Sequence, residues 1–147
     1  MERRRFIKTG CTFCLLVAAG VALPSLTATA GNKRKAYKTE LNDKKQAEVP
    51  LELFAESSLQ IVRIKGSYYD IAVHKEEDGS YKAMLMKCTH MDNQLNITDS
   101  GFLCSQHGSE YDTKGVVTKG PAETPLFVYE TSTNETTLFI NNINIEE

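Results

Sequence analysis

Cysteine and histidine are scarce in this 147-residue chain, which has four of the first and three of the second. Cys11 and Cys14 lie in an uncharged stretch near the N-terminus. They have redox-pair spacing, but no thioredoxin-like fold surrounds them, so we interpret them as spectators. Only Cys88 and Cys104 remain for the rest of the chain. The length fits one small domain plus an export segment and leaves no room for a second catalytic domain.

Positive charge is not in excess either. The 17 Lys and Arg residues face 19 Asp and Glu residues. Without residues 1–30, which hold four basic residues and one acid, these counts fall to 13 and 18, a net charge near −5. Phosphate binding relies on clustered basic charge, so we expect no nucleic-acid partner. The basic run Lys33-Arg34-Lys35 is a local exception, which we interpret as a solvated linker, with contact to lipid headgroups as the alternative.

The N-terminus has the pattern of an export signal, with a basic head, an apolar middle and small residues at Ala28-Thr29-Ala30. Its head, Arg3-Arg4-x-Phe6-x-Lys8, resembles the twin-arginine signal, which exports folded proteins. An ordinary secretory signal is the alternative. The spacing favours cleavage before Gly31. Residues 9–30 are also long enough to stay as a membrane anchor. The expected location is the periplasm or the outer face of the cytoplasmic membrane.

Residues 31–48 are polar and charged, which predicts a linker, and the folded domain is expected from 49 to 147. Short apolar runs of strand length recur there, between turn residues such as Gly66 and Gly79. The runs cover 49–54, 61–64, 68–73, 81–86, 126–129 and 137–140. We therefore predict a mainly β, antiparallel fold without a convincing helix. Around the run 68–73 we expect Tyr69, Ile71 and Val73 to face the core, and Asp70 and His74 to face outward.

Each remaining cysteine has a histidine close behind it, in Cys88-Thr89-His90 and in Cys104-Ser105-Gln106-His107. Two thiolates and two imidazoles suit zinc or an iron-sulfur cluster. A structural zinc site commonly takes two ligands of one type from each loop, whereas each loop here mixes the types. A cluster with two cysteines on one iron and two histidines on the other matches this division. A structural zinc domain without redox activity is the alternative.

The stretch from Cys88 to Ala122 resembles the cluster-binding region of the Rieske family. Its motifs are the boxes Cys88-Thr89-His90-Met91 and Cys104-Ser105-Gln106-His107-Gly108-Ser109, then Glu110-Tyr111-Asp112-x-x-Gly115 and Gly120-Pro121-Ala122. The resemblance implies a Rieske-type antiparallel β domain whose small cluster-binding subdomain, at about 84–122, holds a [2Fe-2S] cluster on two ligand loops.

By this resemblance, Cys88 and Cys104 would bind the inner iron, and His90 and His107 the exposed outer iron. The hydroxyls of Ser109 and Tyr111 would donate hydrogen bonds to cluster or cysteine sulfur, which raises the reduction potential. We expect Gly108 and Gly120 to allow close turns, and Pro121 to stiffen a loop that covers the cluster.

The chain departs from the branch of the family in which the two ligand loops share a disulfide. Asn93 stands where one of those cysteines would be expected, and Ser105 or Gln106 where the other would be. We therefore expect packing and hydrogen bonds to hold the loops. The 13-residue gap between the boxes predicts a trimmed hairpin around Asp99-Ser100-Gly101. That disulfide is usual in the quinol-oxidising subunit of cytochrome bc complexes, so its absence argues against identifying this chain directly with that subunit.

The resulting prediction is an electron-transfer protein that is not catalytic alone. It would serve a redox partner or a membrane oxidoreductase complex, similar to quinol-cytochrome c reductase or to the small subunit of arsenite oxidase. A Rieske oxygenase would need a further iron site with two histidines and a carboxylate, and only His74 is left over. We interpret His74 as a surface residue near the acidic turn of Glu76, Glu77 and Asp78. We interpret Met84 and Met86 as strand packing.

Overall fold

The computed structural model describes residues 35–145. The export segment predicted at residues 1–30 lies outside these residues. Within 35–145, no helix is both long and apolar enough to cross a membrane.

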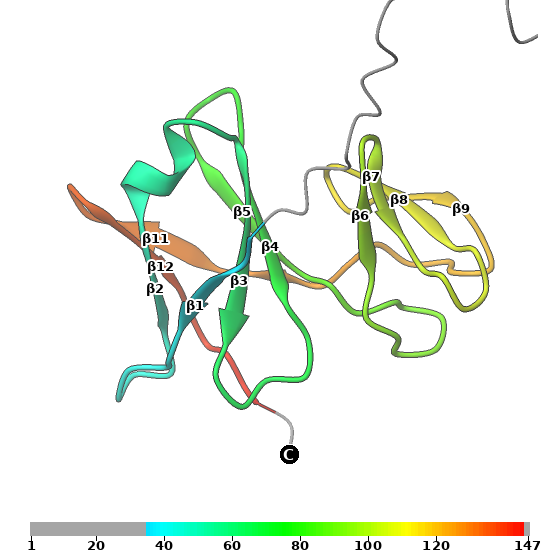
Figure 1. Cartoon of the computed structure of the whole chain (residues 1–147), viewed down its shortest axis with the longest axis horizontal. Coiled ribbons are helices and arrows are strands. Elements are labelled where there is room, and N and C mark those ends of the chain that lie inside the picture. The colour runs from blue at the N-terminus through cyan, green and yellow to red at the C-terminus, as the bar shows by residue number, and fades with distance from the viewer. Residues whose placement is uncertain (1–34, 146–147) are drawn as a thin grey trace, which may run out of the picture. The chain divides into compact units, whose positions relative to one another are not determined.

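Three β-sheets form the described part of the chain (Figure 1). The five-stranded sheet has the order β1 (Tyr37–Thr39), β3 (Leu59–Ile64), β4 (Ile71–Lys75), β5 (Tyr81–Leu85) and β10 (Val128–Tyr129). The three-stranded sheet has the order β11 (Thr131–Thr133), β12 (Thr137–Ile140) and β2 (Ala47–Pro50). The four-stranded sheet has the order β6 (Asn96–Thr98), β7 (Gly101–Leu103), β8 (Glu110–Asp112) and β9 (Val117–Lys119). All pairs are antiparallel except β1 with β3, which confirms the predicted fold class.

The five-stranded sheet is buried on both faces. In β4, Ile71 and Val73 join a core shared with β2 and β12, whereas Ala72 joins a second core shared with β7 and β8. The same alternation places Ala83 and Met84 of β5 in the first and second core, respectively. Successive side chains of a strand point to opposite faces, so β4 and β5 each have consecutive buried apolar residues, Ile71–Val73 and Ala83–Met84. The second core also contains Cys88 and Cys104, so one face of this sheet packs against the candidate site.

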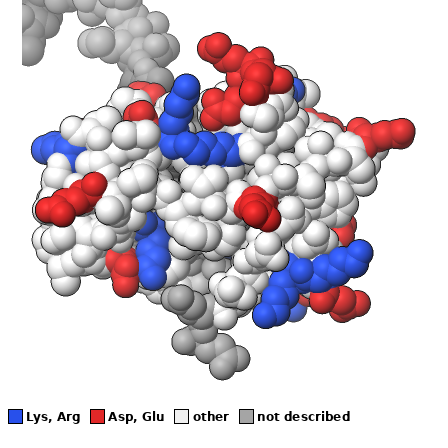
Figure 2. Space-filling view, turned by 180° about the vertical axis from the view of Figure 1, so that it is seen from behind, with Lys and Arg blue, Asp and Glu red and all other residues white. Residues whose placement is uncertain are grey.

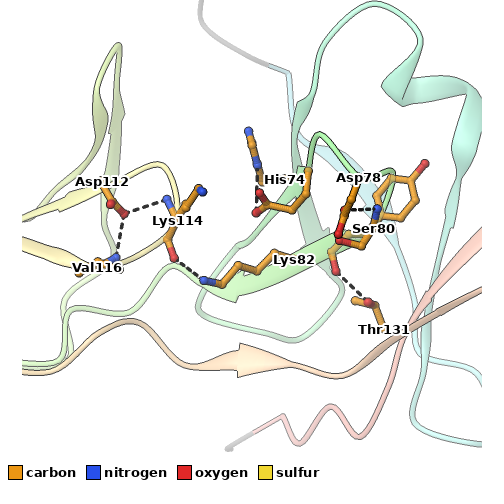
Figure 3. Close-up of polar contacts among 10 residues, drawn as sticks. His74, Asp78, Ser80, Lys82, Asp112, Lys114, Val116 and Thr131 are labelled. Atoms are coloured by element: carbon orange, nitrogen blue, oxygen red, sulfur yellow. Dashed lines mark hydrogen bonds and ion pairs between the residues drawn. The ribbon is translucent and has the colours of Figure 1, made fainter.

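The four-stranded sheet is an insertion between β5 and β10, two strands that pair with each other. The turn between β8 and β9 is fixed to β5 by Lys82, whose Nζ donates a 2.7 Å hydrogen bond to the carbonyl of Lys114 (Figure 3). In the same turn, Asp112 Oδ1 accepts hydrogen bonds from the amides of Lys114 and Val116, each 2.9 Å (Figure 3). The inserted sheet is therefore joined to the five-stranded sheet by the Lys82–Lys114 hydrogen bond as well as by the shared core.

The ordered fold begins earlier than the predicted boundary at residue 49. Tyr37–Thr39 form β1, which pairs in parallel with β3, and Ala47 is completely buried in β2. Tyr37, Leu41 and Ala47 pack in or against the first core, although they are widely spaced in a mostly polar segment. This wide spacing is why the apolar residues of the segment did not predict strands. The expected run 49–54 is also split, since β2 ends at Pro50 and Leu51–Phe54 form the short 3-10 helix η1.

Asp70 differs from expectation, because it is buried rather than exposed to solvent. Its carboxylate accepts two hydrogen bonds from the guanidinium of Arg63, at 2.7 and 2.6 Å. Such a bidentate pair satisfies the hydrogen-bonding needs of a carboxylate that is shielded from water.

The expected hairpin around 99–101 is confirmed as the β6–β7 turn.

The charged side chains of both signs are interspersed over the described residues that Figure 2 shows. On this face, Lys and Arg lie among Asp and Glu and do not merge into one continuous basic area (Figure 2). This distribution matches the acidic balance of the sequence.

Candidate metal centre

Two loops carry the predicted ligands, and they have the same backbone turn. The first loop, 88–93, follows β5, and the second loop, 104–109, connects β7 to β8. The shared hydrogen bonds run from Cys88 N to Asn93 O (2.8 Å), Asp92 N to Cys88 O (2.9 Å), Cys104 N to Ser109 O (2.8 Å) and Gly108 N to Cys104 O (2.9 Å). In each loop the cysteine therefore begins a tight turn that closes on the fifth residue after it.

The fourth residue after each cysteine has a positive φ. In the second loop it is Gly108, with φ 78°, and in the first loop it is Asp92, with φ 50°. Glycine adopts this conformation without steric cost, as the sequence predicted for Gly108. Asp92 is a functional candidate that sequence reasoning missed. The available signal was its equivalence to Gly108, because aspartate is among the few side chains that tolerate the left-handed region.

The two thiols meet at the bottom of the site. Cys88 and Cys104 are both fully buried, and neither forms a disulfide. Burial alone raises the pKa of the Cys88 thiol. Hydrogen bonds from the Tyr111 hydroxyl, from the amides of His90 and Met91 and from Cys104 outweigh burial and lower this pKa below its ordinary value. These hydrogen bonds therefore stabilise a negative charge on the Cys88 sulfur.

The two imidazoles meet at the surface. The rings of His90 and His107 lie edge to face, with centroids 5.0 Å apart and planes at 89°. Both histidines are exposed, in contrast to the buried cysteines. Met91 beside them is also exposed, at 59%. The structure therefore brings all four predicted ligands into one region, with sulfur inside and nitrogen outside.

The two ligand pairs match the division of ligands in a two-iron group. Within residues 35–145, the His, Cys, Asp and Glu side chains do not gather in threes or more where one metal ion could be held. The predicted ligands instead form a thiol pair and an imidazole pair. A [2Fe-2S] centre of mixed ligation needs two sulfur ligands on one iron and two nitrogen ligands on the other. The donors around Cys88 suit the thiolate that such a centre requires.

Tyr111 links the site to the first loop. Its hydroxyl lies 3.5 Å from Cys88 Sγ and 3.0 Å from Thr89 Oγ1, and it accepts a 3.1 Å hydrogen bond from the Thr89 amide. Burial raises the pKa of Tyr111, so the hydroxyl keeps its proton, which it shares between Thr89 Oγ1 and Cys88 Sγ. Thr89, to which the sequence analysis assigned no role, also donates from Oγ1 to the carbonyl of Thr124 at 2.8 Å.

The segment 120–125 covers the region between the two loops. The Thr124 carbonyl holds it to the first loop, and the Ala122 amide donates a 3.0 Å hydrogen bond to Ser109 Oγ beside the second loop. Ser109 is fully buried, whereas Pro121 is exposed and follows a cis peptide bond from Gly120. Two hydrogen bonds and the buried Ala122 hold the segment that the sequence predicted as a covering loop.

The residues that the sequence analysis set aside lie in β4, in the turn after it and in the second core. His74 is in β4, half-buried, with Nδ1 3.4 Å from Glu76 Oε1 (Figure 3). Met84 and Met86 are buried in the second core, which confirms their role in strand packing. The acidic residues 76–78 form the β4–β5 turn, where Asp78 accepts hydrogen bonds from the amide and the hydroxyl of Ser80 (Figure 3).

Part of the chain is similar in sequence to known proteins. The chain is 35% identical over 69 residues to the cytochrome b6-f complex iron-sulfur subunit 2 of Nostoc sp., covering 44% of this chain and 39% of that protein. It is 30% identical over 74 residues to the cytochrome b6-f complex iron-sulfur subunit of Synechococcus elongatus, covering 49% and 41%. The matched region therefore spans about two fifths of the length of these relatives.

The fold also resembles a solved structure, that of the cyanobacterial plasma membrane Rieske protein PetC3 from Synechocystis. The TM-score is 0.53 at 23% identity, over 63% of this chain and 95% of that one. The family model of the Rieske [2Fe-2S] domain matches residues 38–130, from β1 to the end of β10 and its following residue. This match includes both ligand loops and every buried residue of the second core, whereas Leu138, Ile140 and Ile143 of the first core lie beyond it. The chain belongs to the Rieske [2Fe-2S] domain family and, as such, binds a [2Fe-2S] cluster.

Proposed function

We propose that the chain transfers single electrons through a [2Fe-2S] cluster held by Cys88, Cys104, His90 and His107. The cysteines bind the inner iron and the histidines bind the outer iron. When bound, the cluster supplies one-electron oxidation and reduction. The protein acts as a redox subunit or carrier for a larger oxidoreductase and is not catalytic by itself.

The observation that carries this proposal is the opposite burial of the two ligand pairs. Both cysteines are completely buried, whereas both histidines are exposed and touch each other at the surface. A partner can therefore approach the imidazoles while the sulfur side stays dry. Neutral imidazoles leave a cluster less negative than four thiolates do, which raises its reduction potential.

Two hydroxyls are placed to adjust that potential. Tyr111 lies within 3.5 Å of Cys88 Sγ, and Ser109 Oγ accepts the Ala122 amide, which leaves the Ser109 proton as a donor. Hydrogen bonds to cluster sulfur favour the reduced, more negative state. The two hydroxyls raise the potential and the missing disulfide gives no such help, so we expect an intermediate value inside the range of about −150 to +300 mV for Rieske centres.

The proposed place of work is the outer side of the cytoplasmic membrane. The support is the twin-arginine pattern at Arg3 and Arg4, together with relatives that are iron-sulfur subunits of cytochrome b6-f complexes. The proposed partner is accordingly a membrane oxidoreductase complex or a periplasmic redox protein. Residues 9–30 serve as a removable signal or as the attachment to the membrane.

The test is the metal content and the spectrum of the purified full-length chain. We expect iron and acid-labile sulfide, and after dithionite a rhombic EPR signal whose average g-value lies below that of all-cysteine clusters. His90→Ala and His107→Ala should each abolish the signal. His74→Ala is the matched control, because His74 is the third histidine of the chain and lies in β4, so it should keep the full signal.

His107→Cys separates ligation from folding. A cysteine can still bind iron, so the expected variant keeps iron but shows a higher average g-value and a lower potential, because a thiolate is more negative than an imidazole. Zinc without iron in the wild-type chain would contradict the proposal and leave a structural metal domain. An unchanged spectrum in His107→Cys would remove His107 from the ligand set.

A further inference from the structure

Asp92 occupies a strained position that its counterpart Gly108 occupies freely. The two residues are equivalent in the turns that begin at Cys88 and Cys104, and both have a positive φ. A side chain in the left-handed region costs free energy that glycine does not pay. The first loop therefore needs a stabilising contact at Asp92 that the second loop does not need at Gly108.

Two residues outside the first loop supply contacts at this position. The Tyr69 hydroxyl, from the connection between β3 and β4, donates a hydrogen bond to the carbonyl of Asp92. Lys87, the residue before Cys88, lies with Nζ 3.5 Å from Asp92 Oδ1. The same Nζ stands 5.3 Å from the centre of the Tyr69 ring, within cation–π range. Tyr69, Lys87 and Asp92 thus contact one another pairwise, and we call them the loop brace.

The loop brace acts on both sides of Asp92. The hydrogen bond fixes its carbonyl, while its amide is held by the carbonyl of Cys88 at 2.9 Å. Both peptide groups that define the backbone of Asp92 are therefore fixed, and His90 lies within the same short loop. The first loop has no disulfide to restrain it, since both cysteines of the described chain are the predicted ligands.

We propose that Tyr69 and Lys87 are positioning residues for the metal centre, which hold Asp92 in its left-handed conformation and thereby set the orientation of His90. This inference rests on the proposed function, because it assigns the loop brace to the His90 side of the cluster. Tyr69 and Lys87 act through the backbone of the first loop.

The test compares two adjacent tyrosines in the cluster-loaded, full-length protein. Tyr69→Phe removes only the hydroxyl that holds Asp92. Tyr68→Phe is the matched control, because Tyr68 stacks edge to face on Tyr69 but its side chain is 78% exposed. Lys87→Met removes the charge of the loop brace, with Lys75→Met at the exposed end of β4 as its control.

The readouts are the EPR line shape, the rate of cluster loss to an iron chelator, and amide hydrogen exchange. For Tyr69→Phe and Lys87→Met we expect broader EPR lines and cluster loss about fivefold faster, the effect of one lost hydrogen bond on a local opening equilibrium. Exchange should rise at the amides of Cys88 and Asp92 and stay unchanged in β3 and β5. Both control variants should behave as the wild type.

Two results would overturn the inference alone. One is a Tyr69→Phe variant with the wild-type line shape and rate of cluster loss. The other is an equal rise of exchange in the first loop and in β3 and β5, which would indicate general destabilisation instead of positioning. A wild-type chain without the Rieske signal would overturn the proposed function and this inference together, so the two failures are distinguishable.

Discussion

The backbone amide of Ala122 donates a 3.0 Å hydrogen bond to the hydroxyl oxygen of Ser109, and both residues are buried. This contact joins the end of the second ligand loop to the segment that covers it. It also fixes the Ser109 oxygen by its acceptor side, so the remaining proton is free to donate. The Ser109 side chain thus holds the covering segment in place and presents a hydrogen-bond donor to the candidate metal centre.

Ser109→Ala should therefore weaken the cover. The variant leaves the Ala122 amide buried without a partner, which costs about 1–3 kcal/mol. We expect cluster loss at a lower urea concentration than in the wild type, measured by the visible absorbance of the loaded protein. Ser100→Ala, in the exposed β6–β7 turn, is the control. Equal urea midpoints for Ser109→Ala and the wild type would contradict the structural role of this contact.

Tyr111→Phe should lower the reduction potential. The change removes a donor 3.5 Å from Cys88 Sγ and a contact that holds Thr89. A hydrogen bond worth about 1 kcal/mol to the reduced state corresponds to roughly 40 mV for one electron. Protein-film voltammetry measures the shift, and Tyr81→Phe, in the other core, should leave the potential unchanged. A Tyr111→Phe potential equal to that of the wild type would show that the hydroxyl acts on the loop alone.

Gly115→Ala should be more harmful than Gly66→Ala. Both glycines have a positive φ, 79° and 84°, so an alanine is strained at either site by about 1–2 kcal/mol. At Gly115 the new Cβ would also lie 2.9 Å from Met84 Sδ and 3.2 Å from Leu126 Cβ, whereas at Gly66 it would meet nothing within 4 Å. We expect Gly115→Ala to cost roughly 1–3 kcal/mol more because of this crowding. Thermal unfolding of the two variants measures the difference, and equal losses would exclude close packing of the β8–β9 turn on β5.

Acid should remove a contribution of Asp78 to stability. Hydrogen bonds from the hydroxyl and the amide of Ser80 lower the pKa of Asp78 below its ordinary value of 3.8. A carboxyl whose pKa is lower in the folded state stabilises the fold above its unfolded pKa, and this stabilisation is lost as the pH falls through the folded value. Asp78→Asn should therefore be less stable than the wild type at neutral pH, and the difference should shrink below about pH 4. Urea unfolding at several pH values tests this, and a difference independent of pH would contradict it.

The motifs of the sequence located the candidate site because ligand chemistry is local. Each cysteine needs its histidine within a few residues, so spacing alone places the pairs on loops. The contacts that support the loops come from residues far away in the sequence. Tyr69 contacts the first loop across 23 positions, and Thr124 contacts Thr89 across 35. No short motif contains such pairs, and these residues became visible only in the structure.

The fold class was predictable from strand-length apolar runs, but the surroundings of single residues were not. Asp70 has the polarity of a solvent-facing residue, yet it is buried because Arg63 on the neighbouring strand β3 supplies both hydrogen bonds. Ala72 and Met84 interrupt a simple alternation because the five-stranded sheet has a core on each face. A strand covered on both faces has no polar face to reveal its orientation.

The pairing of β5 with β10 has a consequence for protein engineering. Because Ala83 lies opposite Tyr129 and Met84 opposite Val128, the chain leaves and re-enters the five-stranded sheet at neighbouring points. We therefore expect that a short turn can bridge these points and that the segment between them can be exchanged for that of another family member. The exchange must respect Ile61, Ala72 and Met84, whose side chains pack under the segment and would face water in its absence. Together with Lys82 and Tyr69, which donate hydrogen bonds to Lys114 and Asp92 of the segment, these positions define the contacts that any transplanted redox unit has to make.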